Sequence, residues 1–235
     1  MSANSRWQEM ISDNLASASI PGFKKQDVSF AAIQAGLLAT SHGLTPNTLP
    51  QASLSTNFAP GELKPTGSST DVAIDGPGFF QVQLPNGSTG YTRNGEFHLN
   101  AQGQLTTNAG QLVLGDSGPI QLDRSNPAPI SISSTGEVSQ GSDQKGKLQI
   151  MDFNDPHLLT QIGGGCFISN DPQLTASPIA SPSVRQGYLE SANTSPVAEM
   201  ANLITVMRTF EANQRIVQLN DDRMGRAITE LGSPT

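Results

Sequence analysis

Residues 71–82 read DVAIDGPGFFQV. Two short apolar runs, 72–74 and 79–82, lie on either side of Gly76-Pro77-Gly78, residues that favour a turn. Apolar runs this short that end at turn residues are typical of β-strands, because an amphipathic helix needs about ten residues or more. The stretch therefore predicts two β-strands joined by a turn.

The same pattern continues from residue 71 to about residue 189. Further short apolar runs predict strands at 91–93, 97–99, 111–114, 130–132 and 147–150. The last two alternate apolar and polar residues, as half-buried strands do. Asn86-Gly87 and Asn94-Gly95 separate neighbouring runs and predict hairpins, because Asn-Gly accepts the positive φ angles of a tight β-turn. We therefore expect a β-rich central domain over residues 71–189.

The N-terminal segment has helical periodicity instead. Apolar residues recur there at steps of three and four, at Trp7, Met10, Ile11, Leu15 and Ala18. This spacing predicts one apolar face of a helix over about residues 4–18, which Pro21-Gly22 would end.

A second, longer amphipathic segment lies at the C-terminal end. Ser195-Pro196 and Glu199 suit a helix start. The apolar stripe that follows consists of Val197, Met200, Ile204, Met207, Phe210, Val217, Met224, Ile228 and Leu231. A helix over 196–231 is roughly 54 Å long, more than a domain of this size needs to cover its own sheet. We therefore expect the terminal helices to pair with each other or with neighbouring copies, and packing on the sheet of the same molecule is the alternative.

Residues 31–70 fit neither pattern. They carry two charged side chains, Glu62 and Lys64, and four prolines that interrupt every periodic run. This composition predicts an extended connector or a set of irregular edge strands. The expected fold class is mainly β with α-helical termini, in which an N-terminal helical segment (1–30) pairs with a long C-terminal helix (190–235), and the connector (31–70) leads into the β-rich domain (71–189).

Composition excludes several classes of function. The formal net charge of −7 leaves no general attraction for nucleic acid or an anionic membrane. The single cysteine, Cys166, excludes an intramolecular disulfide framework and a cysteine-rich metal site, and we expect it to be buried. No run approaches ~18 apolar residues, so no membrane span is predicted. The first ten residues lack the apolar core of a secretory signal.

Residues 115–119, GDSGP, resemble the nucleophile segment of chymotrypsin-like serine proteases, which makes a hydrolase the rival class. Such a triad needs a histidine and a buried aspartate before the serine. The upstream histidines are His42 in the connector and His98 in an expected hairpin, and His157 follows the serine. We therefore expect Ser117 to be a turn residue, and the unpaired histidines predict neither a metal site nor a cofactor site.

Four arginines, Arg208, Arg215, Arg223 and Arg226, supply every basic charge of the expected C-terminal helix. The planar guanidinium group suits ion pairs between packed subunits better than the ammonium group of lysine. A merely exposed polar face is the alternative.

Three segments together resemble the bacterial flagellar rod and hook family. Residues 12–24, SDNLASASIPGFK, are similar to the family's Asn-Asn-Leu-Ala-Asn and Thr-x-Gly-Phe-Lys signature, with departures at Asp13, Ser17 and Ile20. Residues 71–82 and 91–97 are similar to the family's β domain. Residues 189–193, LESAN, and 208–213, RTFEAN, are similar to the family's C-terminal helix segment, with departures at Ala192 and Thr194.

The resemblance implies a structural, non-enzymatic protein without a cofactor or small-molecule substrate, whose terminal helices form the inner layer of a tubular polymer. Its partners would be copies of itself, other flagellar rod and hook proteins and the flagellar export apparatus. Export through that apparatus would deliver it, without a cleavable signal peptide, to the rod that crosses the periplasm. The proximal-rod type fits best, and a distal-rod or hook subunit is the alternative. The expected assembly interface consists of Asn14, Leu15, Gly22, Phe23, Met200, Ile204, Met207, Phe210, Val217 and Met224.

Overall fold

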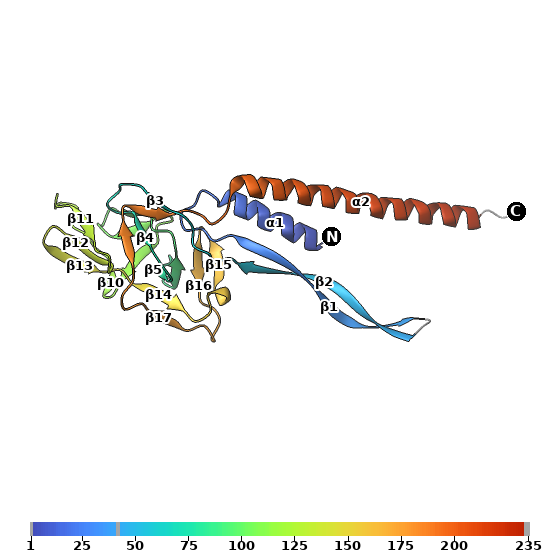
Figure 1. Ribbon diagram of the computed structural model, residues 1–235, viewed down its shortest axis with the longest axis horizontal. Coiled ribbons are helices and arrows are strands. Elements are labelled where there is room, and N and C mark those ends of the chain that lie inside the picture. The colour runs from blue at the N-terminus through green and yellow to red at the C-terminus, as the bar shows by residue number, and fades with distance from the viewer. Residues whose placement is uncertain (1, 41–42, 233–235) are drawn as a thin grey trace. The chain divides into compact units, whose positions relative to one another are not determined.

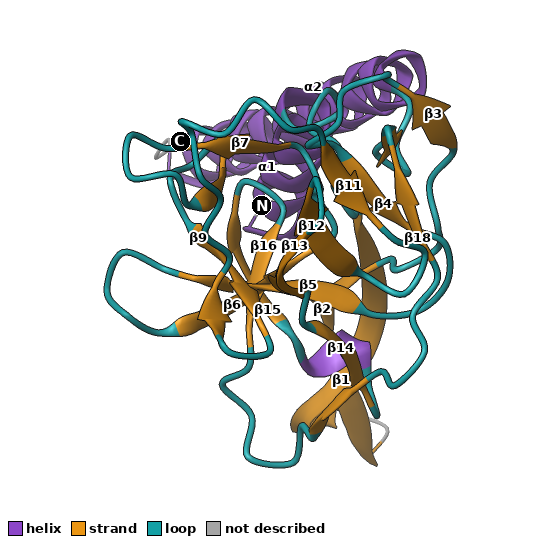
Figure 2. Cartoon of the chain, turned by 90° about the vertical axis from the view of Figure 1, so that its left-hand side faces the viewer, coloured by secondary structure: helices purple, strands orange, loops and turns teal. Residues whose placement is uncertain are grey.

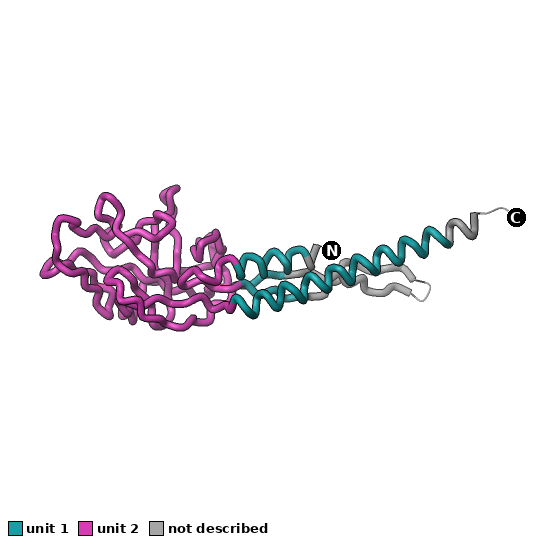
Figure 3. The backbone as a smooth tube through the Cα atoms, turned by 90° about the horizontal axis from the view of Figure 1, so that it is seen from above, with its two compact units in different colours: residues 1–15, 26–55, 196–235 teal, residues 16–25, 56–195 magenta. Residues whose placement is uncertain are grey.

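A computed structural model describes residues 2–40 and 43–232 of the chain, with backbone alone for 2–4, 30–40, 43–52 and 227–232. The chain folds as two compact units, coloured separately in Figure 3. Unit 1 comprises Met1–Leu15, Gln26–Ser55 and Pro196–Thr235, and unit 2 comprises Ala16–Lys25 and Thr56–Ser195. The chain therefore passes from one unit to the other several times.

Unit 1 contains both helices and one long strand pair. Helix α1 spans Ser2–Ala16 and helix α2 spans Pro196–Gly232 (Figure 1). Both expected helices are confirmed, and α2 begins at the proline that the sequence placed at its first position. Strands β1 (Gln26–Thr40) and β2 (Gly43–Thr56) pair as a two-stranded sheet.

This strand pair corrects the interpretation of residues 31–70 as an extended connector or irregular edge strands. Most of the segment is regular, paired β-structure, and beyond β2 a short strand, β3, covers Leu63–Pro65. A two-stranded sheet leaves each strand one unpaired edge, where a missing N–H costs no ladder bond. Pro46 and Pro50 in β2 are four residues apart, so their nitrogens share one edge and the pairing can tolerate both.

Unit 2 is built around a ten-stranded sheet (Figure 2). Its main order is β15-β16-β6-β5-β9-β8-β7, with β10 on β9, β14 on β5 and β17 on β14. These strands are β5 (Phe79–Gln83), β6 (Thr89–Thr92), β7 (Phe97–Leu99), β8 (Leu105–Thr107), β9 (Leu112–Gly115), β10 (Gly118–Pro119), β14 (Ile150–Phe153), β15 (Thr160–Gly163), β16 (Cys166–Ile168) and β17 (Ala176–Pro178).

Three smaller sheets complete this unit. Strands β11, β12 and β13 form one of them, β4 pairs with β18, and β19 pairs with β3. Their bounds are β4 (Val72–Ile74), β11 (Ile130–Ile132), β12 (Glu137–Gln140), β13 (Asp143–Lys147), β18 (Val184–Gln186) and β19 (Tyr188–Glu190), and a short 3-10 helix, η1, covers Pro156–Leu158.

The two Asn-Gly pairs behave differently. Asn86-Gly87 joins the antiparallel strands β5 and β6, and Gly87 has a φ of 82°, which confirms the predicted hairpin. Asn94-Gly95 joins β6 to β7, which pair with other strands, so the second predicted hairpin is wrong. At Gly95 a Cβ would overlap the carbonyl oxygen of Val72, whose own N–H donates to the Gly95 carbonyl over 3.0 Å. This glycine therefore serves a close backbone approach rather than a tight turn.

The strand predicted at 147–150 is also wrong, because this segment is the junction of β13 with β14, which belong to different sheets. Leu148 and Ile150 both face the same buried apolar cluster. The alternation therefore reflects a shared core rather than one continuous strand.

The adjacent residues Phe79 and Phe80 lie in two separate apolar clusters of unit 2. Side chains alternate across a strand, so Phe79 and Phe80 of β5 point to opposite faces. Phe80 lies in the larger cluster, with its ring centroid 5.1 Å from that of Phe97. Phe79 lies in the second cluster, 5.8 Å from the ring of Phe167. Strand β5 therefore contributes side chains to both apolar clusters of unit 2.

Candidate functional site

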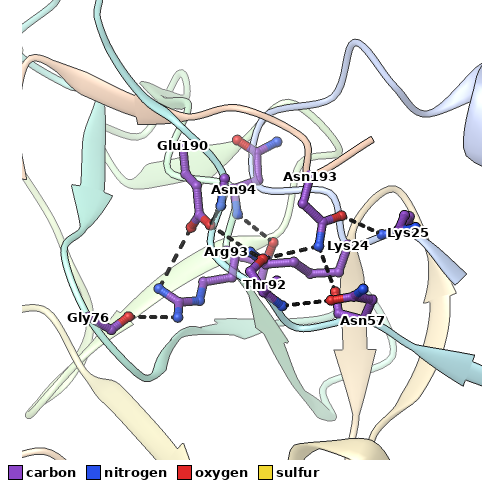
Figure 4. Close-up of polar contacts among 11 residues, drawn as sticks. Lys24, Lys25, Asn57, Gly76, Thr92, Arg93, Asn94, Glu190 and Asn193 are labelled. Carbon is purple, nitrogen blue, oxygen red and sulfur yellow. Dashed lines mark hydrogen bonds and ion pairs between the residues drawn. The ribbon is translucent and has the colours of Figure 1, made fainter. Parts of the chain in front are cut away.

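Unit 2 holds a buried cluster of three charged side chains, Lys24, Arg93 and Glu190 (Figure 4). Their side chains are 0%, 8% and 2% exposed. The ammonium nitrogen of Lys24 lies 2.6 Å from Oε1 of Glu190, and Nη1 of Arg93 lies 3.7 Å from Oε2. Charged groups are buried this deeply almost only when they are paired, so the cluster marks a position where three distant segments must meet.

Glu190 is the centre of this cluster. Its carbonyl accepts a 2.6 Å hydrogen bond from the N–H of Gly22, and Oε1 accepts from the N–H of Gly61 over 2.8 Å. Lys24 also donates to the carbonyl of Ala59 over 2.9 Å. The end of β19 is thereby joined to residues 22–24 and to residues 59–61.

The backbone around Gly22 admits no side chain. Gly22 has a φ of 69°, and a Cβ there would overlap the backbone carbonyl of Arg93. Positive φ is unfavourable for other residues, and the overlap adds a second reason for glycine at this position. Gly22 therefore allows the segment to pass close enough to Arg93 for Lys24 to reach Glu190.

Arg93 occupies the opposite side of the carboxylate. Its Nη2 donates to the carbonyl of Gly76 over 2.7 Å, and its guanidinium carbon lies 5.4 Å from the ring centroid of Phe79. Among the described residues, Arg93 Nε and Glu190 Oε2 have no hydrogen-bond partner. The contact between Arg93 and Glu190 is therefore an electrostatic one at 3.7 Å rather than a hydrogen bond.

The cluster contains two cations and one anion. Removal from water lowers the pKa of the Lys24 ammonium group, and Glu190 opposes this shift. The pKa of Arg93 is likewise lowered by burial, and the carboxylates of Glu190 and Asp152 oppose it. Glu190 is thus the one carboxylate that opposes both pKa shifts.

Asn193 continues the same network. Its Oδ1 accepts from the N–H of Lys25 over 2.8 Å, and its Nδ2 donates to the carbonyls of Asn57 and Ala59 over 2.7 and 3.0 Å. Its own N–H donates to the carbonyl of Phe23 over 3.2 Å. Glu190 and Asn193, the second and last residues of the LESAN segment, therefore both hold the GFK segment, residues 22–24.

Unit 1 has its own polar anchor at Asn14, which is 1% exposed. The side-chain Nδ2 of Asn14 donates to the carbonyl of Gln26 over 2.8 Å, and its Oδ1 accepts from the N–H of Gln26 over 2.9 Å. This reciprocal pair ties the last turn of α1 to the first residue of β1.

One apolar cluster in unit 1 draws on both helices. Met10 and Ile11 of α1 are buried with Val206 of α2, which is fully inaccessible. Trp7, Val28 and Leu203 pack against this cluster. At 1.5 Å per residue, the 15 residues of α1 span about 22 Å and the 37 residues of α2 about 56 Å. Helix α1 can therefore cover less than half of the length of α2.

The residues expected at an assembly interface fall into two groups. Asn14, Gly22 and Phe23 are buried within their own chain, and Leu15 and Phe210 are half-buried. The α2 residues Met200, Ile204, Met207, Val217 and Met224 are 52%, 54%, 48%, 45% and 65% exposed. The first group therefore contacts other parts of the same chain, whereas the second is accessible to another molecule.

The apolar stripe of α2 is two faces rather than one. Successive helix residues are about 100° apart, so Phe210, Val217 and Met224, at steps of seven, follow one line that also passes within about 40° of Val206. Met200, Ile204 and Met207 lie about 100–160° round the helix from Val206. We call the first set the lower line and the second the flank.

The remaining candidates from the sequence carry no reactive arrangement. Ser117 lies exposed in the turn between β9 and β10, as predicted. Cys166 is 2% exposed, which confirms its predicted burial, and removal from water raises the pKa of its thiol. His42 is outside the described residues. Within the described ranges no group of His, Cys, Asp and Glu side chains could hold a metal ion, and no helix combines the length and apolar character needed to cross a membrane.

Sequence reasoning quoted Lys24, Arg93, Glu190 and Asn193 within motifs but assigned them no role. The sequence carries no clear signal for the buried charge, because Lys24 is followed directly by a second lysine, Lys25, which is not part of the cluster. The partner could not be identified either, because Glu190 is 166 positions away from Lys24.

Comparison with known proteins places these features in one family. Residues 73–140 match the family model described as the flagellar hook protein FlgE/F/G D1 domain, and residues 185–230 match that of the flagellar basal body rod FlgEFG protein C-terminal.

Among curated relatives, a flagellar basal-body rod protein FlgF of Caulobacter vibrioides is 31% identical over 225 aligned positions, 95% of this chain and 91% of the relative. FlgF of Escherichia coli K12 is 32% identical over 231 positions, 94% and 90% of the two chains. A flagellar basal-body rod protein FlgG of Buchnera aphidicola subsp. Schizaphis graminum is 32% identical over 240 positions, 92% and 90% of the two chains.

Proposed function

This chain belongs to the flagellar basal-body rod protein family, and from that membership we propose that it polymerises through the accessible faces of α2. The chain is a structural subunit of the bacterial flagellar basal-body rod, and it is not an enzyme. Its function therefore resides in surfaces that contact other rod subunits.

The observation that carries the proposal is the exposure of large apolar side chains along α2. Met200, Ile204 and Met207 on the flank, and Val217 and Met224 on the lower line, are each at least 45% exposed. Contiguous exposed apolar side chains mark interaction surfaces, because their burial against a partner removes apolar area from water. A helix 37 residues long that is packed near its start is suited to bury the remainder against neighbouring subunits.

The expected interface residues outside α2 contribute to assembly indirectly in our proposal. Asn14 holds α1 to β1, Leu15 beside it is half-buried, and Gly22 and Phe23 place the segment that Glu190 and Asn193 bind. In our proposal these residues fix the end of α1 and the segment that leads into α2, and α1 and α2 remain paired in the polymer. A rod that transmits torque needs such fixed junctions, because a loose connection would yield under load.

The chain is of the proximal-rod type in our proposal, and the distal-rod and hook subunits are the alternatives. Alignments with the two FlgF relatives need 225 and 231 positions, whereas the FlgG relative needs 240 to cover a similar share of this chain. Fewer gaps accompany the FlgF alignments, which supports a FlgF-type subunit. Partners include other flagellar rod and hook proteins, and we propose export by the flagellar apparatus into a rod that crosses the periplasm.

The test is Ile204→Asp, which places a carboxylate on the flank. If Ile204 is buried in the polymer, the unpaired charge costs several kcal/mol per subunit, and rods should lack this protein and everything distal to it. Thr209→Asp is the matched control, because Thr209 is exposed on the same helix about 140° away. Cells with Ile204→Asp should be non-motile and cells with Thr209→Asp motile. Normal swimming of Ile204→Asp cells at native expression would show that the flank is not an assembly surface.

A further inference from the structure

Helix α2 carries two accessible apolar patches that lie on different sides of the helix and at different positions along it. The flank lies between residues 200 and 207, and the lower line lies between residues 210 and 224. At 1.5 Å per residue, the central residues of the two patches, Ile204 and Val217, are about 20 Å apart along the helix axis. At 100° per residue, their side chains point about 140° apart. One helix therefore presents two separate contact surfaces.

The packing of α1 explains why the two patches lie at different positions along α2. Figure 1 shows α1 beside the first part of α2, where Met10 and Ile11 of α1 are buried with Val206. Val206 lies on the same side of α2 as the lower line, so α1 already covers this side near the start of the helix. Further along, Val217 and Met224 on this side are exposed. The lower line therefore continues an apolar contact surface that α1 covers only at its start.

The flank and the lower line cannot meet within one molecule, because both lie on one continuous helix. Burial of either patch against a partner would remove apolar area from water. Two different patches on one chain are what a heterologous contact needs, in which the first patch of each subunit binds the second patch of the next. Such a contact repeats without closing on itself and gives an open polymer, whereas a contact between two identical patches gives a closed dimer.

We propose that the lower line of α2 packs on the flank of α2 in a second copy of this chain, with Val217 of one copy opposite Ile204 of the other. Neighbouring subunits of an open polymer point in the same direction, so this pairing displaces the two helices by about 20 Å along their axes. A second copy is the occupant because the chain carries both halves of the contact, and because the lower line continues the helix–helix contact at Val206. This inference rests on the proposed function and adds which two faces meet.

Engineered disulfides test which residues face each other. Ile204→Cys and Val217→Cys are introduced together in the full chain, and assembled rods are oxidised. The two thiols of one chain cannot join each other, because they are about 20 Å apart and a disulfide needs Cα atoms within about 7 Å. Each chain should therefore link to one neighbour through position 204 and to another through position 217. Electrophoresis without reductant should show a ladder of dimers, trimers and longer species that reduction removes.

Three controls isolate this pairing. Either single variant should give no dimer, because each new thiol faces a different residue of the neighbouring chain. The wild type should also give none, because its one thiol, Cys166, is buried. Ile204→Cys combined with Met224→Cys should give at least about tenfold less linked product, because Met224 lies about 10 Å further along the helix than Val217 and so beyond the reach of a disulfide.

A charge exchange is a second measurement that needs no disulfide. Ile204→Asp and Val217→Lys should each lower incorporation into the rod by about a hundredfold or more, because each buries an unpaired charge at every contact. The chain with both substitutions should regain at least about tenfold over either single variant, because the new carboxylate of one copy faces the new ammonium group of the next. In a contact between identical patches, the double variant would place like charges together and regain nothing.

The ladder or the recovery in the charge exchange supports the pairing, and two results would overturn it. One is a dimer from either single-cysteine variant in the same amount as the linked product of the double variant, since this would show a contact between identical faces. The other is the absence of both the ladder and the recovery, including the case in which position 217 links to a different rod protein. Either result leaves the proposed function standing provided that Ile204→Asp still blocks assembly.

Discussion

Lys24 and Glu190, 166 positions apart in the chain, form an ion pair of 2.6 Å in which neither side chain is more than 2% exposed. Arg93 lies against the same carboxylate, so Glu190 is the one anion that acts on both buried cations. The number of cations that Glu190 contacts determines which substitution should lower the free energy of unfolding most.

Replacement of the anion should be more damaging than replacement of a cation. Glu190→Gln leaves Lys24 buried without a counter-charge and leaves Arg93 with the Asp152 carboxylate alone, and removal of one partner of a buried pair costs about 3–5 kcal/mol. Lys24→Met leaves Arg93 and Glu190 still paired, so its loss should be smaller. Urea unfolding followed by circular dichroism measures the free energy of unfolding of both variants. The protease resistance of unit 2 shows which unit has lost stability.

Glu62→Gln is the surface control for this comparison, since the pair of Glu62 with Lys64 spans 3.9 Å and is largely exposed. It should change the free energy of unfolding by no more than ~0.5 kcal/mol. A larger loss for Lys24→Met than for Glu190→Gln would show that the carboxylate is not the centre of the cluster.

Alanine substitutions at two glycines should distinguish the cost of backbone strain from the cost of steric overlap. Gly22→Ala and Gly67→Ala both place alanine at positive φ, 69° and 75°, which costs about 1–2 kcal/mol in each case. At Gly67 no atom lies within 4 Å of the new Cβ, whereas at Gly22 it would overlap the Arg93 backbone. Gly22→Ala should therefore lower thermal stability clearly further than Gly67→Ala. Equal melting temperatures would mean that the approach to Arg93 can relax without cost.

The buried thiol should make unit 2 less stable in alkali. Burial raises the pKa of Cys166 in the folded state, so the folded chain keeps its proton at pH values where the unfolded chain loses it. The stability that this group contributes is complete below its unfolded pKa and is lost as the pH rises toward the folded pKa, by up to about 1.4 kcal/mol per pH unit.

Cys166→Ala removes this dependence. Between pH 8 and 10 the free energy of unfolding of the wild type should fall more steeply than that of Cys166→Ala, although alanine lowers the starting value by leaving a cavity. Parallel curves over this range would contradict the prediction. Alkylation of the thiol at pH 8 should also be slow, because it requires opening of unit 2.

Amide exchange should differ along α2 in the unassembled chain. Val206 is fully buried with Met10 and Ile11, whereas Val217 and Met224 on the lower line are exposed. A helix without packing is marginally stable, so exchange should be slowest around residue 206 and fast beyond residue 211. Assembly should slow exchange along the whole helix. Uniformly slow exchange in a dilute monomer would indicate that the lower line needs no partner.

Local patterns of the sequence determined both helices and several of the short strands. Helix periodicity and Pro196 located α1 and α2, and short apolar runs between turn residues located β4, β5, β7, β9 and β11. Asn86-Gly87 identified its hairpin, and Ser117 and Cys166 were assigned correctly to a turn and to the interior. These features depend on residues within a few positions of one another, so the order of residues is sufficient to read them.

Tertiary structure alone decided which distant segments meet. The pairing of β1 with β2, the position of Gly95 against Val72 and the ion pair of Lys24 with Glu190 all join segments whose partners no local periodicity names. The same is true of α2, where burial of Val206 divides one apolar stripe into a lower line and a flank. Such contacts are selected by backbone hydrogen bonding and by the need to pair every buried charge over the whole fold, and both conditions are met only when the complete chain has folded.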